Sequence, residues 1–163
     1  MEDAIFIRPI EPADNAALAA LIRSTLEEFG VAREGTVYFD PSTDALYEYF
    51  LRDKAVYNVA LLNGNIIGGA GIYPTDGLPA GTCELVRMYL TPATRGLGMG
   101  KKLLELCIGQ ARRFGFGRIY LETLHELNAA LKFYEKAGFR YLSAPLGNSG
   151  HFGCPLWMLR EVG

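Results

Sequence analysis

Three glycines at alternate positions, Gly96, Gly98 and Gly100, lie between Arg95 and Lys101. They follow an expected strand and begin an expected helix, so several backbone N–H groups meet at the positive end of the helix dipole. Because glycine has no Cβ, phosphate oxygens can approach this backbone closely, and the two flanking cations add positive charge. The loop therefore predicts an anion site with a diphosphate as its natural ligand; a tight turn without a ligand is the alternative.

Two well-known nucleotide-binding loops do not match this segment. A Walker A loop has a glycine well before its Gly-Lys pair and a Ser or Thr after the lysine, but Arg95 and Lys102 hold these positions. The dinucleotide fingerprint Gly-x-Gly-x-x-Gly needs its third glycine one residue after Gly100, and it follows the first strand of its domain. Neither a P-loop nor a Rossmann fold is expected.

Strands and helices alternate around the glycine loop. Asn63-Gly64 between two apolar runs predicts a hairpin with a type I′ turn. The order strand, glycine loop, helix, strand over residues 82–124 predicts a right-handed crossover. Since hairpins and a crossover share one chain, we expect an α/β fold with a mixed sheet. The expected strands are 4–8, 55–62, 65–73, 82–90, 118–124, 139–143 and 152–160. The expected helices are 14–29, 43–51, one that follows the glycine loop and includes residues 103–114, and 128–137.

Composition limits the class of protein. The 163 residues are 50% hydrophobic and 21% charged, which predicts one globular domain over residues 1–163. A net charge of -2 supplies no bulk positive field, so we expect no nucleic-acid partner. No apolar run approaches the ~20 residues that span a bilayer, and the acidic start does not resemble a secretory signal. We therefore expect no membrane association and a cytoplasmic location.

The cysteines and histidines do not form a metal-binding pattern. Cys83, Cys107 and Cys154 are odd in number and widely spaced, which disfavours a disulfide scaffold or a zinc ribbon. His125 and His151 do not complete a ligand set with them, and Cys107 falls on an apolar helix stripe. We expect no metal.

The motif Arg95-x-x-Gly98-x-Gly100, after a strand that ends in Leu90-Thr91-Pro92, resembles the signature of the GNAT N-acyltransferase superfamily. Residues 128–139, NAALKFYEKAGF, are similar to the second conserved segment of that family. The resemblance covers residues 82–141 and, more loosely, 4–29. It implies a GNAT-like fold, with a mixed, mostly antiparallel sheet and helices on both faces, and acetyl-CoA as cosubstrate.

The resemblance also implies how the cosubstrate is held. The strand before the loop would offer backbone groups to the pantetheine arm. Asn128 matches an asparagine that contacts the cofactor, with a plain helix N-cap as the alternative. The residues implied for the pyrophosphate are Arg95, Gly96, Leu97, Gly98, Met99, Gly100 and Lys101, and those implied for the pantetheine arm are Met88, Tyr89 and Leu90.

Two further residues receive catalytic roles from the resemblance. Tyr134 matches the tyrosine that lies near the thioester sulfur and protonates the departing thiolate; the alternative is a core aromatic. Glu84 lies eleven residues before Arg95, where some family members carry a general-base glutamate. A strand glutamate paired with Arg87, and water as the base, are the alternatives.

We therefore expect an N-acetyltransferase that moves an acetyl group from acetyl-CoA to an amine by direct attack in one ternary complex. A small-molecule acceptor is expected between residues 31–40 and 148–155, where Tyr38 and Phe39 offer flat apolar surface and His151 offers a polar contact. A noncatalytic CoA-binding module that serves protein interaction is the alternative. The sequence leaves the acceptor unnamed and allows a monomer or a homodimer.

Overall fold

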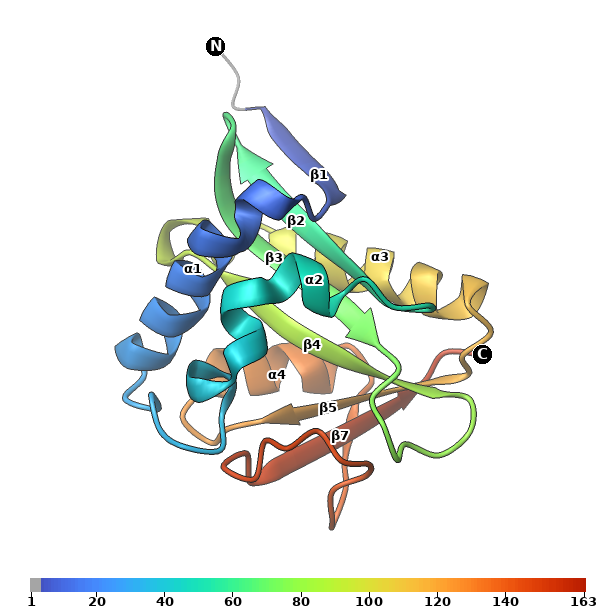
Figure 1. The fold of residues 1–163 in the computed structure, drawn as a ribbon. Helices are drawn as coiled ribbons and strands as arrows, with labels where there is room; N and C mark the ends of the chain where they lie inside the picture. The colour runs from blue at the N-terminus through green and yellow to red at the C-terminus, as the bar shows by residue number, and fades with distance from the viewer. Residues whose placement is uncertain (1–3) are drawn as a thin grey trace.

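The computed structural model describes residues 4–163, in which one twisted sheet is covered by helices (Figure 1). The strands follow the order β1-β2-β3-β4-β5-β7-β6, and each neighbouring pair is antiparallel except β4 and β5, which are parallel. The expectation of a mixed, mostly antiparallel sheet is confirmed. The strands are β1 (Ile5–Pro9), β2 (Val56–Leu62), β3 (Asn65–Tyr73), β4 (Thr82–Leu90), β5 (Arg118–Thr123), β6 (Arg140–Tyr141) and β7 (Leu156–Glu161).

Helices cover both faces of the sheet, as expected (Figure 1). Alternate residues of a strand point to opposite faces, so Tyr57 and Val59 of β2 pack with α1 and α2, while Ala60 packs with α3. Tyr134 of α4 belongs to the same core as α3. Two apolar cores therefore form, one on each face. The helices are α1 (Asn15–Glu28), α2 (Leu46–Tyr49), α3 (Met99–Arg113) and α4 (Asn128–Lys136).

The turn chemistry explains how several elements begin and end. Asn63 and Gly64 both have positive φ, 51° and 81°, which confirms the type I′ hairpin between β2 and β3. Gly30 ends the α1 region with a φ of 71°. The segment expected as a helix over 43–51 contains the end of a 3-10 helix, Pro41–Ala45, and then the short α2, Leu46–Tyr49.

The last strand is shorter than the sequence pattern predicts. It begins at Leu156 rather than at residue 152, because Gly153 donates its N–H to the Gly35 carbonyl at 2.7 Å and leaves the sheet. Cys154 closes a turn by donating to the His151 carbonyl at 3.1 Å. Residues 151–154 are therefore part of a loop that contacts the segment after α1.

The parallel pair β4 and β5 opens the sheet. The two strands pair only where Thr82–Glu84 meet Arg118–Tyr120, and then they diverge. Residues 85–90 of β4 keep their pairing with β3 on one edge, and β5 no longer pairs with the other edge. This divergence lies between α1, α3 and α4 and creates the space for a ligand. No helix within residues 4–163 is long and apolar enough to cross a membrane.

Candidate active site

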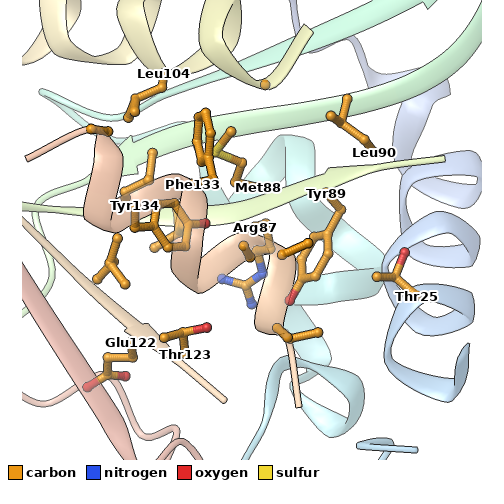
Figure 2. A pocket seen from close by; sticks show the side chains of 18 of the residues that line it. Thr25, Arg87, Met88, Tyr89, Leu90, Leu104, Glu122, Thr123, Phe133 and Tyr134 are labelled. Carbon is orange, nitrogen blue, oxygen red and sulfur yellow. The ribbon is translucent and has the colours of Figure 1, made fainter. Parts of the chain in front are cut away.

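A cavity of about 1090 Å³ fills the space between the diverging strands. Its wall runs from Gly96, Gly98 and Lys101 at the glycine loop to Glu84 and His151 at the other end. Side chains of β4, α4 and α1 lie between these ends, as Figure 2 shows for Met88, Tyr89, Tyr134 and Thr25. The cavity therefore joins the predicted anion loop to the predicted catalytic side chains.

The glycine loop has the backbone geometry that a phosphate site requires. Gly96 and Gly98 have positive φ values of 78° and 81°, and Gly98 occupies the N-cap position of α3. A Cβ at either glycine would meet no atom within 4 Å, so the space beside this backbone is open. Lys101 lines the cavity from the first turn of the helix. The loop thus fits a diphosphate, with helix-terminal N–H groups and a cation at one place.

The two apolar residues of the loop have different environments. The Leu97 side chain is exposed, whereas Met99 is buried in the core on the α3 face. Neither residue lines the cavity, so a contact of Leu97 or Met99 with a diphosphate stays a prediction. Gly100 lies against Met88, whose terminal carbon would be 3.4 Å from an added Cβ.

Arg95 ties the loop to α1. Its Nη1 and Nη2 donate to the two carboxylate oxygens of Glu28 at 2.8 and 2.9 Å, and its Nε donates to the Leu90 carbonyl at 3.1 Å. The guanidinium carbon also lies 5.3 Å from the ring centre of Phe29. Arg95 therefore holds the end of β4 and the loop in place while it lines the cavity.

We expect Arg95→Ala to weaken acetyl-CoA binding by about 10- to 100-fold, because one charge-assisted contact is worth ~1.5–3 kcal/mol. Glu28→Gln is the matched variant. If Arg95 binds phosphate, removing the competing Glu28 carboxylate leaves affinity unchanged or higher. Calorimetry with acetyl-CoA distinguishes this from a purely structural clamp, for which both substitutions lower the affinity.

The middle of β4 contains a bulge. The register between β3 and β4 shifts between Gly69 and Gly71, and Arg87 takes a positive φ of 47°. This backbone conformation is unusual for a residue with a side chain and costs about 1–3 kcal/mol. The Tyr57 hydroxyl donates to the Arg87 carbonyl at 2.7 Å and holds the bulge. Met88, Tyr89 and Leu90 follow the bulge and line the cavity, as the resemblance implies for the pantetheine side.

Tyr134 of α4 lines the cavity while it packs as a core aromatic. Only 7% of its surface is exposed, and its ring contacts those of Phe133 and Phe139 at centre distances of 5.6 and 5.7 Å. In Figure 2 its hydroxyl points toward the other lining side chains. Burial raises the pKa of Tyr134 above its ordinary value, so the phenol keeps its proton near neutral pH. The side chain therefore carries a proton that it could give to a thiolate, although burial makes the phenol a weaker acid.

Glu84 lies at the other end of the cavity, on the part of β4 that still pairs with β5. It is 4% exposed, and its Oε1 accepts a hydrogen bond from the Thr75 hydroxyl at 2.6 Å. Burial raises the pKa of Glu84 to about 7, against the opposing effect of the Thr75 hydrogen bond. Arg87 forms its ion pair with Asp40, at 3.3 Å. A carboxyl that titrates near neutrality is a suitable general base.

Asn128 is the first residue of α4 and is exposed, while Leu127 occupies the N-cap position. The plain N-cap alternative therefore does not describe it. Leu127, Ala129 and Ala130, its neighbours in sequence, line the cavity. A contact between Asn128 and the cosubstrate stays a prediction.

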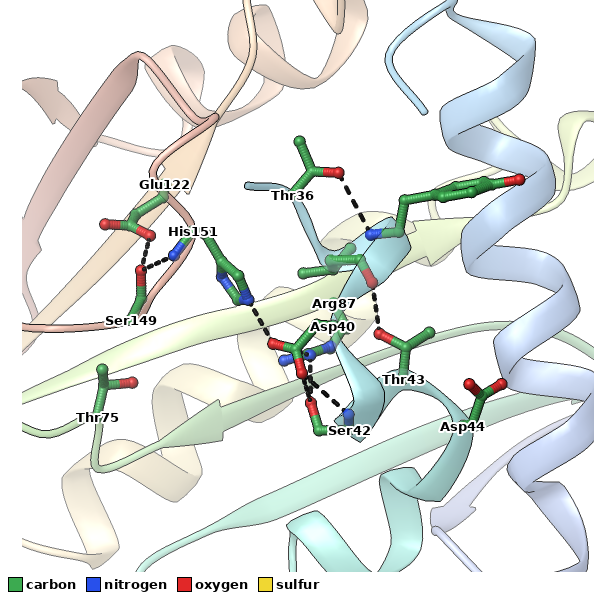
Figure 3. Close-up of polar contacts among 12 residues, drawn as sticks. Thr36, Asp40, Ser42, Thr43, Asp44, Thr75, Arg87, Glu122, Ser149 and His151 are labelled. Carbon is green, nitrogen blue, oxygen red and sulfur yellow. Dashed lines mark hydrogen bonds and ion pairs between the residues drawn. The ribbon is translucent and has the colours of Figure 1, made fainter. Parts of the chain in front are cut away.

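The two segments expected to hold the acceptor lie against each other. His151 Nε2 lies 2.7 Å from Asp40 Oδ2, and His151 lines the main cavity (Figure 3). Phe39 is exposed and borders a smaller recess beside it. Tyr38 is turned toward α1, where its hydroxyl donates to Glu27 at 2.6 Å. The His151 side chain, which we expect to contact the acceptor, is therefore hydrogen-bonded to Asp40.

Sequence reasoning missed the carboxylates Asp40 and Glu122 and gave Arg87 no role of its own. Arg87 interrupts the apolar run of residues 85–90, which was the available signal. Burial raises the pKa of the Cys154 thiol to about 12, so this cavity residue is a protonated thiol rather than a nucleophile. Within residues 4–163, His, Cys, Asp and Glu form no group of three or more that could hold a metal ion. That this protein needs no metal stays a prediction.

Comparisons with known proteins agree with this geometry. The model of the acetyltransferase (GNAT) family matches residues 18–139. The uncharacterized N-acetyltransferase YjgM of Escherichia coli K12 is 40% identical over 157 residues, which cover 96% of this chain and 94% of that protein. A GNAT-family acetyltransferase from Staphylococcus aureus Mu50 superposes with a TM-score of 0.86 at 24% identity, over 98% of this chain and 100% of that one. The Salmonella typhimurium protein yncA, solved with its cofactor acetyl-CoA, has a TM-score of 0.75 at 22% identity, covering 98% of this chain and 95% of its own.

Proposed function

We propose that this chain transfers an acetyl group to the amine of a small molecule by direct attack in one ternary complex. The chain belongs to the acetyltransferase (GNAT) family and is an N-acetyltransferase that uses acetyl-CoA. The observation that carries the proposal is a single cavity that contains an anion loop, a protonated phenol and a carboxyl with a pKa of about 7. Residues 1–163 would form one catalytic domain.

The described residues fit acetyl-CoA. The open backbone at Gly96 and Gly98, with Lys101 and Arg95, would hold the diphosphate. The β4 edge at Met88 to Leu90 would contact the pantetheine arm. The bound molecule supplies the activated acetyl group as a thioester. Most of the cavity wall is apolar, so bound acetyl-CoA would exclude water from it and strengthen polar interactions there.

Glu84 would remove the proton that keeps the acceptor nitrogen from attacking. An ammonium has no free electron pair, so the amine must lose a proton before or as it reacts. Glu84 would accept this proton directly or through water; it lines the cavity and accepts a hydrogen bond from Thr75, which supports this role. Tyr134 would donate its phenolic proton to the departing sulfur. Above about pH 7 the Glu84 carboxyl is mostly ionised while the Tyr134 phenol keeps its proton, so one group can accept a proton while the other gives one.

The test is the pH dependence of Glu84→Gln with an amine that the enzyme accepts. A general base must be deprotonated, so we expect kcat/KM of the wild type to rise with pH up to about 7 and then level. Glu84→Gln should remove this limb and lower the rate by about 10²-fold or more. Release of free CoA thiol measures both.

Thr75→Val is the matched variant for this test. The Thr75 hydroxyl lowers the pKa of Glu84, so its removal should move the acidic limb to higher pH without abolishing activity. A limb that stays in place in both variants would show that another group, or water, acts as the base.

A further inference from the structure

Asp40 and His151 form a carboxylate–imidazole pair at the end of the cavity where we expect the acceptor. Nε2 of His151 lies 2.7 Å from Asp40 Oδ2 (Figure 3). The hydrogen bond with His151 and two from Ser42 hold the pKa of Asp40 well below its usual range, so Asp40 is a carboxylate that can only accept. Nε2 therefore carries the proton and donates it to Asp40. In the neutral ring this leaves Nδ1 with a free electron pair.

The second ring nitrogen of His151, Nδ1, has no hydrogen-bond partner among residues 4–163, yet these residues do not enclose it. The backbone N–H of His151 donates to the Ser149 hydroxyl at 3.1 Å, which fixes the residue in the cavity wall. The side chain is 11% exposed, and the spaces that it borders are the cavity and the recess beside it. Nδ1 is therefore a hydrogen-bond acceptor that a bound molecule can use.

Asp40 is held from the side opposite to His151. Its Oδ1 accepts from the Ser42 N–H at 2.9 Å and from the Ser42 hydroxyl at 2.7 Å. Its Oδ2 lies 3.3 Å from Nη2 of Arg87, whose side chain is fully buried. The two oxygens thus have separate partners, because Oδ1 anchors the carboxylate to Ser42 while Oδ2 faces Arg87 and His151.

The bulge in β4 brings Arg87 to this carboxylate. Cys83 and Leu85 face the core of α3, and strict alternation would send Arg87 to that same apolar face. The bulge and the positive φ of 47° turn it instead toward Asp40 and Ser42, on the face of α1 and α2. A strained backbone conformation is thus kept at the place where it orients one carboxylate.

The two loops that carry the pair are joined without it. Gly153 donates its N–H to the Gly35 carbonyl at 2.7 Å. A Cβ at Gly35 would overlap the Gly153 nitrogen, and a Cβ at Gly153 would overlap the Glu34 carbonyl oxygen, so the two backbones are in direct contact. The hydrogen bond between Asp40 and His151 is therefore not needed to tie the loops, which favours a role toward the cavity.

We propose that His151 Nδ1 accepts a hydrogen bond from the amine of the acceptor, and that Asp40 is the positioning residue that keeps Nδ1 free of a proton. The inference rests on the small-amine acceptor proposed above. A primary ammonium has three N–H groups, so one can pass its proton to Glu84 while His151 holds another. The two contacts together fix the direction in which the free electron pair of the nitrogen develops.

His151→Asn and His151→Gln distinguish this role from a structural one. The asparagine amide takes the place of Nδ1 but is too short to reach Asp40. The glutamine amide reaches the place of Nε2 and can donate to Asp40, but it leaves no acceptor at Nδ1. We expect His151→Gln to lower kcat/KM for the amine by about 10- to 100-fold, the range of a hydrogen bond to a charged group, and His151→Asn to lower it less.

Release of free CoA thiol measures these rates with ethanolamine, glycine, putrescine and phenethylamine, which pair a primary amine with a polar, acidic, cationic or aromatic group. The Kd for acetyl-CoA, measured by calorimetry, should stay unchanged in both variants. His125 is the other histidine of the chain and is exposed, so His125→Asn is the control and should keep the wild-type rate.

Asp40→Asn tests the positioning. The Ser42 N–H needs an acceptor, so the asparagine oxygen stays at the Oδ1 position and the amide NH2 faces Nε2. Because NH2 donates, Nε2 must lose its proton and Nδ1 must gain it. We expect kcat/KM to fall by about tenfold or more, in line with the loss of one hydrogen bond to a charged group. NMR of the imidazole nitrogens reports the tautomer, and His151→Asn assigns the signals.

The wild-type protein decides the inference even where a variant fails to fold. At a pH where the ring is neutral, Nδ1 of His151 should be unprotonated, and its NMR signal should move when the best amine is added with CoA, while the His125 signals stay. A protonated or unresponsive Nδ1, or a His151→Asn protein no better than His151→Gln, overturns the inference and leaves the small-amine acceptor standing. Wild-type enzyme that acetylates a lysine-containing peptide but none of the four amines overturns both.

Discussion

Replacing Tyr134 with phenylalanine should lower kcat by about 10²- to 10⁴-fold, the usual contribution of a general acid. The ring keeps its contacts with Phe133 and Phe139, so the core of α4 stays packed and acetyl-CoA still binds. Only the proton for the departing sulfur is lost. Single-turnover rates with a saturating amine separate this chemical step from product release.

Tyr141→Phe is the control for this substitution. Tyr141 is exposed, and its hydroxyl donates to Glu135 at 2.7 Å on the outer side of α4. The same loss of one hydroxyl there should leave kcat unchanged. If Tyr134→Phe keeps a rate within about twofold of the wild type, the residue serves packing alone and the thiolate takes its proton from solvent.

Gly98→Asp should lower the affinity for acetyl-CoA by about 100-fold or more, because like charges placed together cost several kcal/mol. The added side chain would project into the open space at the N-terminus of α3, where the loop is proposed to hold the diphosphate. Its carboxylate would also repel that diphosphate. Isothermal calorimetry with the folded variant measures the loss.

Two variants separate charge from backbone strain at this glycine. Gly98→Asn has nearly the same shape without the charge, and asparagine tolerates the positive φ of 81° better than most residues. It should bind acetyl-CoA better than Gly98→Asp does. Gly109→Asp adds the same charge within α3, where an added Cβ also meets open space, and should bind normally. Unchanged binding by Gly98→Asp would remove the diphosphate from this loop.

The amino-acid sequence by itself determined the features that depend on neighbours along the chain. Gly96, Gly98 and the Asn63-Gly64 turn require positive φ, a property of the residue itself, so their roles were readable without a fold. The periodic spacing of apolar residues predicted the main strands and helices, because this spacing also depends only on neighbours along the chain. Glu84 and Tyr134 received their candidate roles from the resemblance to the GNAT family. The last strand was misjudged because its start depends on a contact with Gly35, far away in sequence.

Only the tertiary structure decided the environment of the candidate catalytic groups. The pKa of Glu84 rises to about 7 because β3, β5 and the loop at Thr75 bury it, and burial is a property of the assembled sheet. Asp40 and His151 are 111 residues apart in sequence and meet at 2.7 Å. Arg87 contacts Asp40 and Ser42 because a bulge reverses its expected face. Pairings across strands and between distant loops have no local signal, because their energy exists only once the chain has brought both partners together.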